Sequence, residues 1–75
     1  MTPQAGEIWQ HYKTRGEYEI IGIGKLQTKV AELDMKECVI YKAPSGSLWS
    51  RPLADFIEEV LNEGEEKVLR FTKIK

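Results

Sequence analysis

Short runs of β-branched and aromatic residues, separated by turn residues about every ten positions, make up most of the chain. Such runs, bounded by glycine, proline, asparagine or serine, are typical of an all-β domain. The pattern predicts strands over 7–13, 17–26, 37–43, 48–51 and 68–74. The intervening segment 27–35 is polar and fits either a loop or a short irregular strand.

Two glycines, Gly22 and Gly24, interrupt the longest predicted strand. Glycine within a strand usually marks a bulge, a bend or a close backbone approach. We therefore expect this strand to bend sharply near its middle.

The most distinct local signal lies in residues 37–51. A β-rich run ends at Ala43, the turn sequence Pro44-Ser45-Gly46-Ser47 follows, and a second short run begins at Leu48. This order predicts an antiparallel hairpin.

The segment after Pro52 fits two periodicities. Its apolar residues have the i, i+3, i+4 spacing of a helix, whereas Phe56, Glu58 and Val60 alternate as a strand would. We predict one helical turn over 53–56, followed by a short strand over 57–61.

These elements predict one all-β domain over residues 1–75, with five or six short strands and at most one helical turn. An SH3-like barrel is the favoured architecture, and a strongly twisted antiparallel sheet is the alternative. An OB-type barrel fits less well because the sequence lacks a helix between strands. A chain of 75 residues buries a small core, so modest stability is expected.

Cysteine and histidine usage limits the chemistry. Cys38 and His11 are the only residues of their kinds, so one chain forms neither a disulfide nor a Cys/His zinc site. Apolar neighbours predict that Cys38 is a buried thiol. No metal and no cofactor is expected.

No apolar run is long enough to span a membrane, and the first residues lack the basic and apolar regions of a signal peptide. We therefore expect a cytoplasmic protein that does not enter membranes.

The charges nearly balance but are unevenly distributed. The net charge of −1 argues against a general electrostatic attraction to nucleic acid. Residues 55–66 nevertheless contain six acids and no base, and the tail from Lys67 onward is basic. A solvated acidic turn followed by a strand with an exposed basic edge explains this distribution.

Several sequence blocks, in order, resemble a known family. They are Trp9-x-His11-Tyr12-Lys13, Gly16-x-Tyr18, Val39-x-Tyr41 and Leu48-Trp49-x-Arg51-Pro52-Leu53-x-x-Phe56. Together they resemble the small bacterial family catalogued as domain of unknown function 1653, over about residues 6–74. The chain departs from the family pattern where Thr14 and Arg15 precede Gly16, and in the polar segment 25–34. The resemblance implies a small all-β domain and brings no established activity.

Catalysis is not expected. His11 lies beside basic residues, but no nucleophile is marked to accompany it. Gly22-Ile23-Gly24-Lys25 lacks the remaining residues of a phosphate-binding loop. The carboxylates of 55–66 lack the spacing of a calcium loop.

Aromatic residues interleaved with bases form the candidate binding set, which consists of Trp9, His11, Tyr12, Lys13, Arg15, Tyr41, Trp49 and Arg51. The favoured function is a non-catalytic module that binds a peptide or another protein, whose identity and oligomeric state the sequence leaves open. The alternative is a nucleic-acid-binding module that combines the same aromatics with five bases: Lys13, Arg15, Arg51, Arg70 and Lys73.

The two tryptophans have a competing explanation. A small domain needs its large side chains in the core, so core packing is the favoured role of both Trp9 and Trp49. Arg51 could likewise be structural, stacked on a tryptophan or paired with Glu58 or Glu59.

Overall fold

The computed structural model describes residues 2–75 and shows seven strands and one short helix in that range. The elements, in chain order, are β1 (Ile8–His11), β2 (Glu17–Lys25), β3 (Glu37–Lys42), β4 (Leu48–Pro52), α1 (Leu53–Phe56), β5 (Glu59–Leu61), β6 (Lys67–Leu69) and β7 (Phe71–Lys73). The prediction of a mostly β chain is confirmed.

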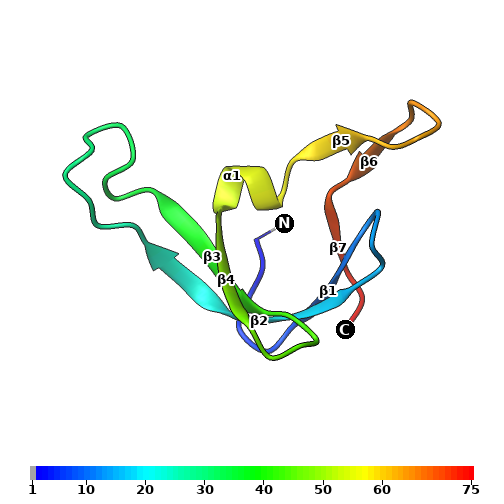
Figure 1. The fold of residues 1–75 in the computed structure, drawn as a ribbon, viewed down its shortest axis with the longest axis horizontal. Helices are drawn as coiled ribbons and strands as arrows, with labels where there is room; N and C mark the ends of the chain where they lie inside the picture. Colours follow the sequence, from blue (N-terminus) through cyan, green and yellow to red (C-terminus); the bar gives the residue numbers. More distant parts are fainter. Residues whose placement is uncertain (1) are drawn as a thin grey trace.

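Five strands form one antiparallel sheet in the order β4-β3-β2-β1-β7, and β5 pairs with β6 in a separate hairpin. Figure 1 shows the sheet strongly bent, with α1 lying above the bend. The two edge strands, β4 and β7, do not pair with each other, so the sheet is not a closed barrel. The twisted-sheet alternative is therefore the correct one.

The bend occurs at the glycines, as predicted. The pairing of β2 with β3 changes register between Ile20 and Gly22, which is a bulge. Two residues further on, a Cβ on Gly24 would lie 3.2 Å from the Ile40 side chain. Gly24 thus allows β3 to approach closely just beyond the bulge.

The hairpin predicted over 37–51 is also confirmed. β3 and β4 pair from Cys38 opposite Pro52 to Lys42 opposite Leu48. Gly46 has a φ of 93°, a left-handed conformation that glycine adopts at little cost, and its N–H donates to the Ala43 carbonyl.

The ambiguous segment after Pro52 divides as predicted. One helical turn, α1, ends where the Ile57 N–H donates to the Leu53 carbonyl, and β5 follows at Glu59. The expected last strand over 68–74 is instead divided at Arg70, because its N–H turns to the Glu58 carbonyl. This division explains why the chain has seven strands rather than five or six.

An aromatic cluster forms the core beneath α1. Phe56 of α1 and Phe71 of β7 stack face to face, with ring centroids 4.0 Å apart. Trp9 and Tyr41 meet the Phe56 ring edge-on, each at 5.5 Å. The buried apolar residues are Trp9, Ile20, Val39, Tyr41, Phe56 and Phe71. Five of these residues come from the sheet, so α1 is held to it by a single buried side chain.

Glu7 connects three segments around this core. Its carboxylate accepts hydrogen bonds from the Trp9 indole N–H and the Gln4 backbone N–H, both at 2.9 Å, and lies 3.4 Å from the Lys73 ammonium. The Trp9 hydrogen bond, followed by the Gln4 hydrogen bond, lowers the pKa of Glu7. The polar atom of the buried tryptophan is thereby satisfied.

Cys38 is half-buried rather than buried. Its register partners are Gly24, which has no side chain to cover it, and Pro52 at the end of the edge strand. Within residues 2–75, no helix is both long and apolar enough to cross a membrane.

Candidate functional site

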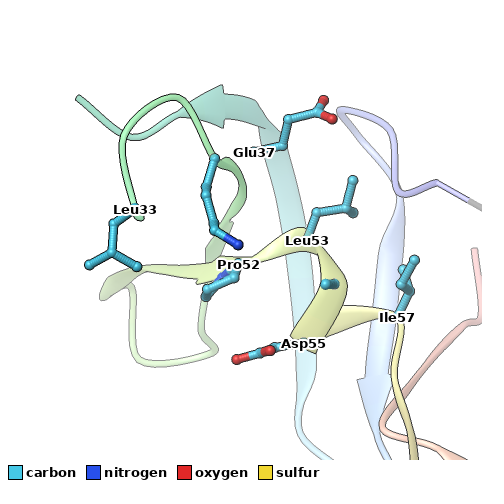
Figure 2. Close-up of a pocket in the computed structure, with 8 residues that line it drawn as sticks. Leu33, Glu37, Pro52, Leu53, Asp55 and Ile57 are labelled. Atoms are coloured by element: carbon cyan, nitrogen blue, oxygen red, sulfur yellow. The ribbon is translucent and has the colours of Figure 1, made fainter. Parts of the chain in front are cut away.

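An open hollow of about 540 Å³ lies between α1 and the loop that joins β2 to β3. Figure 2 shows Leu33 of that loop on one side and Leu53 and Ile57 on the other, with Pro52 between them. The residues lining this groove are Leu33, Lys36, Glu37, Pro52, Leu53, Ala54, Asp55 and Ile57. Five of the eight are apolar, and we call this feature the α1 groove.

The loop side of the α1 groove is held by its own hydrogen bonds. Leu26 and Lys36 continue the pairing of β2 with β3, since the Leu26 N–H donates to the Lys36 carbonyl at 2.8 Å. Beyond them, the Leu33 N–H donates to the Val30 carbonyl at 3.0 Å, and Asp34 accepts a hydrogen bond from the Thr28 N–H. These bonds give the loop a defined shape and leave Leu33 45% exposed.

The helix side of the groove is held by the core and by Arg70. Phe56 is buried in the core, Leu53 packs partly against that core, and both Leu53 and Ile57 line the groove. The Arg70 guanidinium donates to the Asp55 carbonyl at 3.1 Å and to the Glu58 carboxylate at 3.2 Å. Arg70 therefore ties the end of α1 to the strand pair behind it.

The charged side chains around the α1 groove are mostly acidic. Glu37 and Asp55 line it together with one base, Lys36. The same loop also carries two acids, Glu32 and Asp34, and a second base, Lys29, and the acidic segment 55–66 begins in α1. The groove thus combines an apolar floor with a rim of predominantly negative charge.

Two of the candidate residues from the sequence are part of the core. Trp9 is 3% exposed, and Tyr41 is also buried among the aromatic rings. A ligand at the surface would not contact these rings directly, so their role is to support the sheet. The expectation that Trp9 is a core residue is confirmed.

Trp49, by contrast, is 57% exposed, so the expectation that it packs in the core is wrong. It pairs with Tyr41 and shares its face of the sheet, but it lies on the edge strand β4, where nothing within residues 2–75 covers it fully.

Arg51 is half-buried and its guanidinium lies 5.8 Å from the centre of the Phe71 ring. The expected partners of Arg51 are therefore wrong: it stacks on a phenylalanine instead of a tryptophan, and Glu58 pairs with Arg70.

The remaining candidates gather at the turn between β1 and β2. Nδ1 of His11 accepts hydrogen bonds from the backbone N–H groups of Lys13, at 3.1 Å, and Thr14, at 3.4 Å. Tyr12 and Arg15 line two smaller hollows of about 250 and 310 Å³ beside Asn62 of the β5–β6 hairpin. The His11 ring is 5.0 Å from Phe71, so this turn and Arg51 contact the same core ring.

A scan against protein-family models matches residues 7–73 to the family described as protein of unknown function (DUF1653). The chain belongs to this family. The match confirms the resemblance carried by the Trp-x-His-Tyr-Lys and Leu-Trp-x-Arg-Pro-Leu-x-x-Phe blocks. A search of curated proteins and a search of solved structures each found no match.

Sequence reasoning missed the α1 groove of this DUF1653 domain. Segment 27–35 is polar on average, which hid the exposed apolar side chains of Val30 and Leu33. The helical spacing of Leu53 and Ile57 was consistent with burial, but only Phe56 of α1 is buried. The available signal was the presence of three large apolar residues in a segment with no strand pattern: Val30, Leu33 and Met35.

The histidine, cysteine and acidic side chains of the DUF1653 domain are dispersed over residues 2–75. Within residues 2–75, no three His, Cys, Asp or Glu side chains lie together in a position to share a metal ion. His11 uses its Nδ1 to hold a turn and packs its ring on Tyr12 and Phe71. Its visible role is structural.

His11 should make the stability of the DUF1653 domain depend on pH. Burial, followed by the nearby positive charges of Arg51, Arg70 and Lys13, lowers the pKa of His11 from its ordinary value of 6.5. As the pH falls through 6.5, His11 is protonated in the unfolded chain while it stays neutral in the folded chain. Protonation therefore stabilises the unfolded state, and the free energy of unfolding decreases. We expect the unfolding temperature to fall between pH 7 and pH 5.

The control for this prediction is His11→Asn, whose side-chain oxygen can still accept from the turn N–H groups but does not titrate. Because His11 is the only histidine, this variant should lose most of the decrease over that interval. An equal decrease in both proteins would show that other groups cause it.

Proposed function

We propose that this domain is a non-catalytic binding module that holds a peptide segment of another protein in the α1 groove. The observation that carries the proposal is the groove itself, an open apolar hollow between two segments held by hydrogen bonds. Ligand sites are typically concave and apolar, with a few charged groups that fix orientation. A cytoplasmic setting belongs to the same proposal, because the single Cys38 has no disulfide partner in the chain.

The shape of the α1 groove supports a small apolar anchor as the central contact. Leu33 and Ile57 form opposite walls, and each stays partly exposed at 45% and 39%. A leucine-sized side chain inserted between them would remove both walls from water. Burying one such side chain contributes about 1.5–3 kcal/mol.

The rim charges support a basic peptide over an acidic one. Asp55 and Glu37 line the groove, and the only base among the lining residues is Lys36. A lysine or arginine beside the apolar anchor would meet complementary charge, which accelerates association and selects against acidic partners. The proposed ligand is therefore a segment with one apolar anchor and at least one adjacent base.

Nucleic acid, the alternative partner, receives less support from the positions of the bases. Arg70 pairs with Glu58, Lys73 pairs with Glu7, and Arg51 is half-buried against Phe71. Lys13 and Arg15 lie at the β1–β2 turn, but they share a hollow with Glu63. Phosphate contacts need several bases directed at one strand of nucleic acid. We therefore place the nucleic-acid function second.

Selection of peptides from a displayed random library on the immobilised domain tests the proposal. We expect enrichment of sequences with one apolar residue next to lysine or arginine. Ile57→Ser, which removes one wall of the groove, should weaken the best selected peptide about tenfold. Asp55→Lys should weaken it about three- to tenfold at low salt and less at high salt.

Leu61→Ser and Glu63→Lys are the matched controls, because they make the same chemical changes on exposed residues outside the α1 groove. Both should bind the selected peptide as the unmodified protein does. Equal losses in the groove variants and the controls would contradict a specific site in the groove, as would a selection that enriches no common pattern.

A further inference from the structure

The outer edge of β4 exposes backbone groups that can be identified from the pairing pattern. The Leu26 N–H donates to the Lys36 carbonyl on one side of β3, and the Ala43 N–H donates to the Ser47 carbonyl on the other. Hydrogen-bonded and non-bonded pairs alternate along antiparallel strands. Counting from Lys36, the even-numbered residues of β3 therefore bond to β2. Counting back from Ala43, the odd-numbered residues bond to β4. Trp49 and Arg51 consequently bond inward to β3.

Leu48 and Ser50 therefore direct their N–H and C=O groups away from the sheet. Within residues 2–75, no hydrogen-bond partner is found for these groups, because β4 is the last strand in the sheet order. Pro52 lies opposite Cys38 in a non-bonded pair, where the backbone nitrogen points away from β3. Proline has no N–H, so it fits this position without the loss of a hydrogen bond to β3.

The two edge strands of the sheet differ in how well they are protected against pairing with another chain. At the other edge, the short strand β7 ends in Lys73, and Arg70 and Lys75 flank it. Charged residues on an edge strand discourage pairing with another chain. β4 has no bulge, its exposed residues Leu48 and Trp49 are apolar, and its one charge, Arg51, turns inward over Phe71.

We propose that β4 pairs with β4 of a second copy of this chain, antiparallel and across a two-fold axis at Ser50. In this arrangement the two Ser50 residues exchange N–H···O bonds across the axis, and Leu48 of each copy lies opposite Pro52 of the other. The edge strand is complementary to itself, as a two-fold interface requires.

The side chains fit the same register. Trp49 of each copy lies directly opposite Arg51 of the other in a non-bonded pair, where side chains approach most closely. An arginine over an indole is a favourable cation–π contact. The arrangement thus places Arg51, which lies over Phe71 of its own chain, beside the exposed Trp49 of the other copy, and it places no two like charges opposite each other.

Sedimentation velocity over a hundredfold range of protein concentration tests the dimer. We expect the sedimentation coefficient to rise with concentration toward that of a dimer. Ser50→Lys and Ser50→Glu each place two like charges across the two-fold axis and should weaken association at least about tenfold. An equimolar mixture of these two variants should associate again, and Ser50→Ala should behave as the unmodified chain does.

Ser50 is exposed and bonds to no other strand through its side chain, so these variants should stay folded, which circular dichroism verifies. A chain that remains monomeric at the highest concentration would overturn the proposal. A dimer that persists unchanged in both charge variants would overturn it as well, because it would then form through another surface. Neither result depends on whether the α1 groove binds a peptide.

Discussion

Phe56→Ala is expected to remove a large part of the free energy of unfolding of the protein. Phe56 is fully buried, stacks on Phe71 at 4.0 Å and contacts Trp9 and Tyr41, so its removal leaves a cavity at the centre of the core. Replacing a buried phenylalanine by alanine costs about 3–5 kcal/mol. A domain of this size has a total stability of only about 4–11 kcal/mol, at roughly 0.05–0.15 kcal/mol per residue.

Urea denaturation followed by circular dichroism measures this effect. Ile57→Ala is the matched control, because Ile57 is the next residue and is 39% exposed. It should change the free energy of unfolding by less than about 1 kcal/mol. If the two variants lost similar stability, Phe56 would not be the residue that attaches α1 to the sheet.

The two tryptophans are expected to respond in opposite ways to alanine substitution. Trp9→Ala removes a buried ring and leaves the Glu7 carboxylate without its indole donor, so it should cost about 3–5 kcal/mol. Trp49→Ala removes a ring that is mostly in water and should change the free energy of unfolding by less than about 0.5 kcal/mol. Denaturation of the two single variants compares them directly.

Fluorescence supplies an independent check on the same pair. In the Trp9→Phe variant only Trp49 emits, and its spectrum should be that of a solvent-exposed indole, readily quenched by iodide. At concentrations where the proposed β4 dimer forms, quenching should decrease. A protected Trp49 at low concentration, or a severe loss of stability in Trp49→Ala, would contradict its placement at the edge of the sheet.

The strands and the bend were predictable because their causes are local. The turn at Gly46, the bulge at Gly22 and the helical turn after Pro52 each follow from the backbone preferences of a few residues. The division of the last strand was not predictable, because it depends on where the Arg70 N–H finds the distant Glu58 carbonyl.

The exposure of large side chains depended on the topology. Trp9 and Trp49 each lie in a short predicted strand, but β1 lies inside the sheet and β4 lies at its edge. Only the strand order distinguishes them. The α1 groove was missed for the same reason, since it joins Leu33 to Leu53 and Ile57 across a distance in sequence that no local pattern encodes.

The most direct test of the central claim is a nitrogen–proton NMR titration of the labelled domain with the best peptide from the library selection. A parallel titration would use mixed single-stranded RNA at low and near-physiological salt. Binding in the α1 groove predicts peptide-induced shifts centred on Leu33, Lys36 and residues 53–57, with little response to RNA at near-physiological salt. Shifts confined to Lys13, Arg15 and Arg51, produced by RNA and fading as salt rises, would contradict the peptide function and favour nucleic acid instead.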